Sequence, residues 1–208
     1  MTRMSPSPTK GRGLRGVFVD DNMDLILKKL FSIKGCKFEY SGPPEILGQR
    51  AAGVSIDTRT LQPNEIYFAL RGERLDGHDF VPNAFEKQAL AAVVERDWWK
   101  QAQKSQKSRP VFIVEDSLTA LQETARDYRK KFSLPVLGLT GTNGKTTTKE
   151  MIAAVLAHLG SICKTEGNLN NHIGLPLSLL KLNRGHKAMV AEMGTNHFGE
   201  IARLCEIA

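Results

Sequence analysis

Cysteine, aromatic residues and long apolar runs are all scarce in this 208-residue chain. Its three cysteines lie far apart, without the paired spacing of metal ligands. We therefore expect reduced thiols that act as small buried hydrophobic residues, namely Cys36, Cys163 and Cys205. No apolar stretch reaches the roughly 20 residues that a membrane-spanning helix needs, and the first 22 residues lack the apolar centre of a secretory signal. We expect a cytoplasmic protein without membrane insertion.

Acidic residues are absent from the first 16 positions, where much of the excess positive charge lies. The formal net charge is +7, and four of these charges belong to Arg3, Lys10, Arg12 and Arg15. The remaining +3 is only mildly basic, and the chain has no aromatic residues interleaved with basic ones, which argues against nucleic-acid binding. Met23 heads the first periodic apolar segment, so we predict that residues 1–22 form a basic, disordered leader.

Apolar periodicity divides the rest of the chain into two sections. In the first, residues 23–131, we predict short elements: helices over 24–33 and 82–89, and strands over 53–56, 66–70, 90–94 and 111–114. Residues 98–110 are rich in Gln, Lys and Ser and are expected to form a polar connection. A helix over 117–132, with its apolar residues on one face, should link this section to the next.

The second section, residues 132–208, alternates strands and helices, which indicates a parallel sheet with crossover helices. We predict strands over 134–139 and 187–193, a short helix over 173–182, and a helix over 145–159. The fold class is therefore α/β. A small mixed α/β amino-terminal domain is followed by the start of a parallel-sheet P-loop ATPase domain.

A glycine-rich turn separates the first strand of this second section from its long helix. It reads Thr-Gly-Thr-Asn-Gly-Lys-Thr-Thr over residues 140–147. A helix start offers free backbone N–H groups and the positive end of the helix dipole, which suits a polyphosphate. Lys145 supplies a mobile charge for the β and γ phosphates, and the Thr146 hydroxyl suits Mg²⁺. We predict an ATP site formed by Gly141, Thr142, Asn143, Gly144, Lys145, Thr146 and Thr147.

Two residues separate the glycines of this loop, whereas the general phosphate loop has four. The alternative interpretation is a glycine turn with an incidental lysine.

Glu192 ends the strand predicted over 187–193. At the carboxyl edge of a parallel sheet, beside the loop, a carboxylate can hold Mg²⁺ directly or through water. A strand-end glutamate is otherwise often solvated or an N-cap. We predict Thr146 and Glu192 as metal ligands, and Lys145 and Glu192 as catalytic residues.

Polar residues elsewhere are further candidates for the site. Three of them follow the predicted strand over 53–56, namely Asp57, Thr58 and Arg59. They either contact a uracil or diphosphate group of a substrate or simply cap a turn. We also assign Asn171 and His197 to the rim of the ATP site, although Asn-rich loops mostly satisfy their own turns.

Several stretches resemble one enzyme family. Residues 140–147 resemble the ATP loop of the Mur ligases, cytoplasmic enzymes that extend the peptide of the bacterial cell-wall precursor. Residues 53–59, 67–72 and 76–80 resemble the amino-terminal domain shared by the members that add the third residue and the dipeptide. Residues 166–171 and 192–201 are similar to the dipeptide-adding members.

The resemblance covers about residues 23–208 and implies an ATP-dependent ligase. Members use ATP and Mg²⁺ to phosphorylate the carboxylate of UDP-N-acetylmuramoyl-tripeptide, and the amine of D-alanyl-D-alanine then displaces the phosphate. Residues 23–131 would bind the uridine-linked substrate, and residues 132–208 would begin the central ATP domain. Members continue with more of that domain, including a carbamylated lysine and a second magnesium, and with a carboxy-terminal domain. We therefore expect the leading part of a longer enzyme, monomeric and nearly inactive alone.

Two other interpretations stay open. The first is a related ligase that adds the third peptide residue or extends folate with glutamate, because these enzymes share the chemistry of the loop. The second is a non-catalytic nucleotide-binding module.

Overall fold

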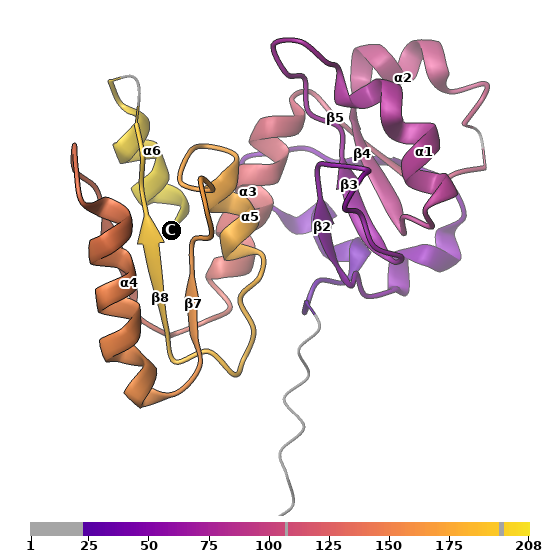
Figure 1. Cartoon of the computed structure of the whole chain (residues 1–208). Coiled ribbons are helices and arrows are strands. Elements are labelled where there is room, and N and C mark those ends of the chain that lie inside the picture. Colours follow the sequence, from indigo (N-terminus) through magenta and orange to yellow (C-terminus); the bar gives the residue numbers. More distant parts are fainter. Residues whose placement is uncertain (1–22, 107, 196–197) are drawn as a thin grey trace, which may run out of the picture.

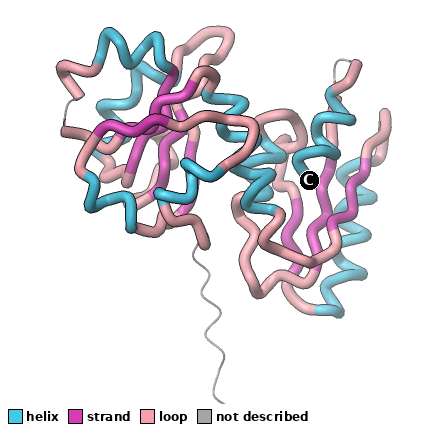
Figure 2. The backbone as a smooth tube through the Cα atoms, turned by 180° about the vertical axis from the view of Figure 1, so that it is seen from behind, coloured by secondary structure: helices cyan, strands magenta, loops and turns pink. Residues whose placement is uncertain are grey.

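The computed structural model describes residues 23–106, 108–195 and 198–208, so the predicted leader, residues 1–22, lies outside the described residues. The described part forms two sheets, and the helix α3 (Ser117–Arg129) runs between them (Figure 1). Seen from the opposite side, helices also separate the two groups of strands (Figure 2). The predicted α/β class is confirmed.

The first sheet has five strands in the described part of the chain, in the order β1-β5-β4-β3-β2. Its strands are β1 (Glu39–Ser41), β2 (Gly53–Ser55), β3 (Glu65–Phe68), β4 (Ala91–Glu95) and β5 (Val111–Val114). Strands β2 to β5 pair in parallel, and β1 pairs antiparallel with β5. Alternate side chains of a strand point to opposite faces, so this sheet contributes to two cores.

The two faces of the first sheet are covered by different helices. Val93 and Phe112 pack with Leu121 of α3 and with the 3₁₀-helix η1 (Leu27–Ser32). On the other face, the alternate strand residues pack with α1 (Val81–Glu86) and with the tryptophans of α2 (Arg96–Ala102). Further single turns of 3₁₀-helix are η2 (Pro44–Gly48), η3 (Gly77–Phe80) and η4 (Ala157–Leu159).

The second sheet has the strand order β6-β8-β7, and all its pairings are parallel. Its strands are β6 (Val136–Leu139), β7 (Ile162–Lys164) and β8 (Ala188–Glu192), and its helices are α4 (Lys145–Leu156), α5 (Gly174–Leu179) and α6 (Glu200–Ile207). The central strand β8 is buried along its whole length. Because the strands are parallel, their carboxyl ends meet at one edge, where the candidate site lies.

Most predicted elements are present with shorter bounds, but three expectations were wrong or incomplete. The polar connection predicted over 98–110 is partly wrong, because its first residues belong to the helix α2. The Trp98 and Trp99 side chains of this helix pack against the core on the α1 side of the first sheet. The three-residue strands β1 and β7 were not predicted at all. The helix predicted over 24–33 is the 3₁₀-helix η1.

All three cysteines are free, as expected. Only Cys163 fits the expectation of burial, and burial raises the pKa of its thiol to about 11. Cys36 is half-buried, and the expectation is wrong for Cys205, which is an exposed residue of α6. Within the described residues, no helix combines the length and the apolar character that a membrane span requires.

Tyr128 connects α3 to both sections of the chain. Its buried hydroxyl accepts a hydrogen bond from the backbone N–H of Asp24 (3.1 Å) and donates one to the backbone carbonyl of Leu182 (2.8 Å). The two bonded groups lie on opposite sides of α3 in the sequence, so a single phenol joins three segments.

We expect Tyr128→Phe to lower the free energy of unfolding by about 1–3 kcal/mol, because it leaves the buried Leu182 carbonyl and the partly buried Asp24 N–H without this partner. Urea unfolding of the wild-type and variant chains measures the loss. Tyr40→Phe is the control, since the Tyr40 hydroxyl bonds only to the nearby Pro43 carbonyl and is expected to cost less. Equal stability of wild type and Tyr128→Phe would contradict the idea that the Tyr128 hydroxyl stabilises the contact between these three segments.

Candidate active site

The phosphate-binding loop predicted from the sequence connects the end of β6 to the start of α4. Gly144 has φ 74° and Gly141 has φ 154°, backbone conformations that favour glycine. A Cβ atom added at Gly144 would meet no atom within 4 Å, so the outer side of the loop is open. Lys145 reaches back across the loop, and its Nζ donates to the Gly141 carbonyl oxygen at 2.7 Å. The loop therefore presents a helix start and an ammonium group toward open space.

Glu192 lies beside this loop at the carboxyl end of β8, and its side chain is buried with 3% exposure. Its Oε2 accepts a hydrogen bond from Thr146 Oγ1 at 3.1 Å, and its Oε1 accepts one from Asn170 Nδ2 at 3.0 Å. The Glu192 backbone N–H donates to Thr165 Oγ1 at 3.0 Å. The structure thus brings together the two residues that the sequence suggested as metal ligands, and it adds Asn170 as a partner.

Neighbouring groups stabilise the ionised form of the Glu192 carboxyl. Burial raises the pKa of this carboxyl, but hydrogen bonds from Asn170 and Thr146 and the nearby Lys149 ammonium outweigh burial and lower the pKa below its ordinary value. Lys149 was not predicted as a site residue, yet its Nζ lies 3.5 Å from Glu192 Oε2. The signal was present in the sequence, because residues three apart on a helix, such as Thr146 and Lys149, share one face.

Lys145 opens onto a cavity of about 490 Å³. Most of its lining comes from the loop after β7 and the segment after β8, and Glu73 comes from the section that carries the first sheet. The lining residues are Glu73, Lys145, Asn168, Asn170, Asn171, His172, Gly194, Thr195 and Glu200. Asn171 lines this cavity, and its Oδ1 accepts hydrogen bonds from the backbone N–H groups of Ile173 and Gly174 and so caps the start of α5. Its place at the rim of the ATP site stays a prediction. His197, the other predicted rim residue, lies outside the described residues.

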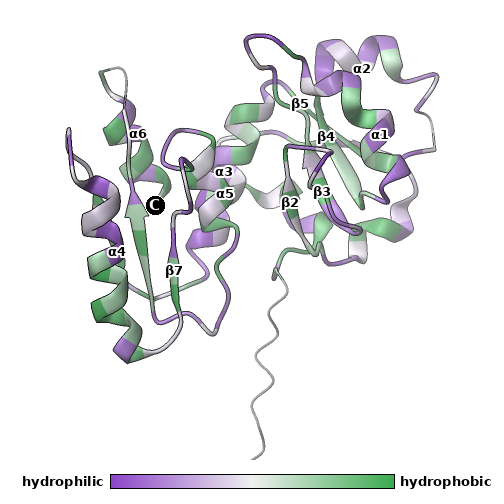
Figure 3. Ribbon diagram, in the orientation of Figure 1, coloured by the Kyte–Doolittle hydropathy of each residue, from purple (hydrophilic) through white to green (hydrophobic). Residues whose placement is uncertain are grey.

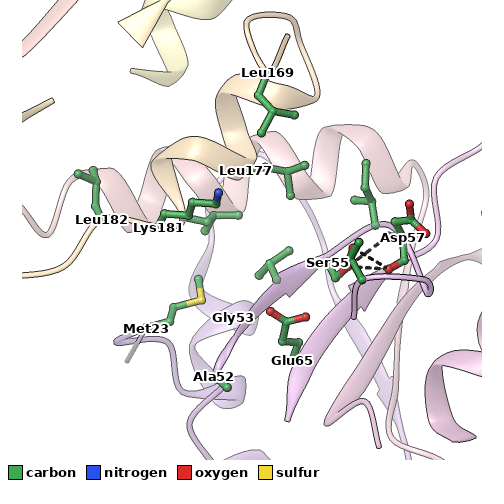
Figure 4. A pocket seen from close by; sticks show the side chains of 14 residues that line it. Met23, Ala52, Gly53, Ser55, Asp57, Glu65, Leu169, Leu177, Lys181 and Leu182 are labelled. Carbon is green, nitrogen blue, oxygen red and sulfur yellow. Dashed lines mark hydrogen bonds between the residues drawn. The ribbon is translucent and has the colours of Figure 1, made fainter. Parts of the chain in front are cut away.

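One of the three predicted substrate residues lines a second cavity. Asp57 lines a space of about 510 Å³ between β2 and α5, whereas Thr58 and Arg59 are not among its lining residues (Figure 4). Asp57 accepts hydrogen bonds from the Arg59 backbone N–H (2.9 Å) and from its guanidinium (2.7 Å to Oδ2), and the Arg59 side chain lowers the pKa of the Asp57 carboxyl. These contacts favour the turn-capping interpretation for this pair, and its substrate contact stays a prediction.

Two models of one protein family match the chain. The Mur ligase family catalytic domain matches residues 50–129, and the Mur ligase middle domain matches residues 139–208. The chain belongs to the Mur ligase family. It is 45% identical over 156 residues to the UDP-N-acetylmuramoyl-tripeptide–D-alanyl-D-alanine ligase of Bacillus subtilis, a match that covers 75% of this chain and 33% of that protein.

Solved structures agree with the sequence matches. MurF from Acinetobacter baumannii has a TM-score of 0.77 and 29% identity, over 90% of this chain and 39% of that one. MurF from Thermotoga maritima, solved in complex with ADP, has a TM-score of 0.65 and 38% identity, over 75% of this chain and 35% of that one. These matches confirm the resemblance to the dipeptide-adding members. The chain spans about a third of the length of the curated relatives that it matches.

Proposed function

We propose that this chain is the front part of an ATP-dependent ligase that joins D-alanyl-D-alanine to UDP-N-acetylmuramoyl-tripeptide in the cytoplasm. The observation that carries the proposal is the meeting of Lys145, Thr146 and Glu192 at one edge of the second sheet. The printed names of the relatives supply the substrates. Residues 23–131 form the proposed substrate domain, and residues 132–208 begin the proposed ATP domain.

The residues at this edge suit a magnesium nucleotide. A hydroxyl and an ionised carboxylate, 3.1 Å apart, are the hard oxygen donors that Mg²⁺ prefers. Both Glu192 oxygens accept hydrogen bonds, and the Thr146 hydroxyl, whose hydrogen is donated to Glu192, keeps its own lone pairs available for a cation. Thr146 and Glu192 would therefore hold Mg²⁺ at this edge, Glu192 either directly or through water. When bound, magnesium neutralises negative charge on the transferred phosphoryl group.

The chain's own groups bring two anions together. A nucleotide triphosphate and a substrate carboxylate repel each other, and this repulsion opposes their approach unless positive groups lie between them. Lys145 carries such a charge and lines the 490 Å³ cavity. The backbone from Gly141 to Thr147 would hold the phosphates, and the Lys145 ammonium, which donates to the Gly141 carbonyl oxygen, would supply positive charge to the phosphate oxygens.

The interdomain cavity is the proposed place for the uridine end of the substrate. Its volume of about 510 Å³ lies in the usual range for small-molecule sites, and it combines the apolar side chains of Leu169 and Leu177 with polar groups such as Ser55 of β2 (Figure 4). Asp57 fixes the guanidinium of Arg59, whose side chain is 87% exposed, at one end of β2. Asp57, Thr58 and Arg59 are the proposed contacts to uracil or diphosphate.

The experiment that tests this function is a pair of calorimetric titrations on the chain. ADP with MgCl₂ and UDP-N-acetylmuramoyl-tripeptide without ADP are each expected to bind, because the two ligands occupy different cavities. In the complete enzyme, coupling of D-alanyl-D-alanine to the tripeptide, compared with single amino acids and folates, distinguishes the related ligases. A chain that binds ADP but not the uridine-linked peptide would support the non-catalytic module instead, and no heat with either ligand would refute the proposal.

A further inference from the structure

Lys149 is the only lysine or arginine whose side chain is buried among the residues that the structure describes, with 2% exposure. It lies in the second turn of α4, and its Nζ sits between two carboxylates. Glu192 Oε2 is 3.5 Å away, and Glu150 Oε1 is 3.6 Å away. A buried ammonium is costly unless it is paired, so its position between these carboxylates accounts for its burial.

The position of Lys149 is more specific than stability alone requires. Its Nζ lies near Oε2 of Glu192, the same oxygen that accepts a hydrogen bond from the Thr146 hydroxyl. The proposed metal position is beside this hydroxyl. Charge-assisted hydrogen bonds between nitrogen and oxygen measure about 2.7–2.9 Å, so a separation of 3.5 Å indicates an ion pair rather than a tight hydrogen bond. Such a contact can be exchanged for another without breaking a strong directional bond.

Glu150 offers a second place for the Lys149 charge. Its side chain is 49% exposed, and it also pairs with Lys164 from β7. The Lys149 ammonium therefore has a buried partner at the proposed metal position and a half-exposed partner on the other side, at nearly equal distances. A small rotation of a flexible side chain is enough to change which carboxylate it favours.

We propose that Lys149 is an internal counter-cation, which holds Glu192 in place in the metal-free protein and shifts toward Glu150 when Mg²⁺ binds beside Thr146. Lys149 is thus a positioning residue that acts through Glu192. The inference rests on the proposed nucleotide site and adds to it a competition between a lysine and a metal for one carboxylate oxygen. Like charges repel, so the presence of Lys149 weakens Mg²⁺ binding, while the presence of Glu150 strengthens it.

The test measures ADP affinity by calorimetry on the 208-residue chain, in EDTA and in MgCl₂. The readout is the ADP affinity in MgCl₂ divided by the ADP affinity in EDTA, a ratio that isolates the contribution of the metal. We expect Lys149→Met to raise this ratio at least about fivefold, since the competing charge is gone, and Glu150→Gln to lower it at least about threefold, since Lys149 then stays on Glu192. Glu115→Gln, an exposed carboxylate paired with Arg96 in the first sheet's region, is the matched control and should leave the ratio unchanged.

Thermal unfolding without nucleotide provides a second readout. In EDTA, Lys149→Met is expected to unfold at a lower temperature than the wild type, because Glu192 loses its buried counter-charge, and MgCl₂ should restore part of that loss. If Lys149→Met does not fold, the affinity ratio of Glu150→Gln tests the inference by itself, because Glu150 is half-exposed and its replacement should leave the fold intact. Ratios that stay unchanged in the variants that fold would overturn the inference and leave the nucleotide site intact. A wild-type chain that binds no ADP would overturn both.

Discussion

Replacing Lys145 by alanine is expected to weaken the binding of ADP and ATP by about 30-fold to 200-fold, which corresponds to about 2–3 kcal/mol. The lysine supplies the mobile positive charge of the phosphate loop, and a charge-assisted bond to a phosphate is among the stronger single contacts in a nucleotide site. In the structure its Nζ donates a hydrogen bond to the loop's own Gly141 carbonyl, so its removal should leave the fold and the unfolding free energy almost unchanged. Calorimetry with MgCl₂ and urea unfolding measure the two quantities separately.

Lys100→Ala is the control for this variant. Lys100 is an exposed lysine of α2 that pairs with Asp97, far from the loop in the sequence, and its loss should not affect nucleotide binding. Binding of the uridine-linked peptide should also survive Lys145→Ala, because the second cavity does not include this residue. A Lys145→Ala chain that binds ADP within about threefold of the wild type would refute the phosphate role. In the complete enzyme, turnover within about tenfold, or roughly 1.4 kcal/mol, would do the same.

Features that depend on neighbouring residues were predictable from the sequence. The strand over 111–114 has the observed bounds, because four consecutive apolar residues are buried on both faces of the mostly parallel first sheet. The phosphate loop is a local strand–turn–helix pattern, so its position between β6 and α4 follows from the sequence. The meeting of Glu192 with Thr146 was also expected, since parallel strands end at a common edge.

Features that depend on distant partners were not predictable in the same way. The region of α2 looks polar, and only the packing of its two tryptophans against the first sheet gives this helix a partly buried side. Asn170 was one of several asparagines in its loop, and nothing in the sequence singles it out as the partner of Glu192. The cavity at Lys145 also includes Glu73, more than 70 positions earlier in the chain, which no local pattern connects to the loop.

The helix α4 shows what periodicity can and cannot predict. Its apolar residues share one side, as expected, and appear as green bands along the helix in Figure 3. In the described structure, however, Met151, Val155 and the following Leu159 are 65%, 69% and 63% exposed. Periodicity identifies a face that is suited to burial, but it does not say which segment covers that face.

Gly174 is where the fold and the candidate site depend most directly on each other. It begins α5, and a Cβ atom added there would lie 2.3 Å from Leu169 Cα and 2.5 Å from the Leu169 carbonyl carbon. These are backbone atoms, so the clash cannot be relieved by rotating a side chain. The helix start therefore packs directly against the loop whose next residue, Asn170, donates to Glu192.

We expect Gly174→Ala to lower the free energy of unfolding by about 2–3 kcal/mol, because the loop or the helix must move to accommodate the methyl group. Movement of the loop also carries Asn170 away from Glu192, so the affinity for ADP with MgCl₂ should fall severalfold in the molecules that remain folded. Gly48→Ala is the matched control, since a Cβ atom there would meet no atom within 4 Å, and its stability should stay within about 0.5 kcal/mol of the wild type. If urea unfolding shows the two variants to be equally stable, the close contact between α5 and this loop does not position Glu192.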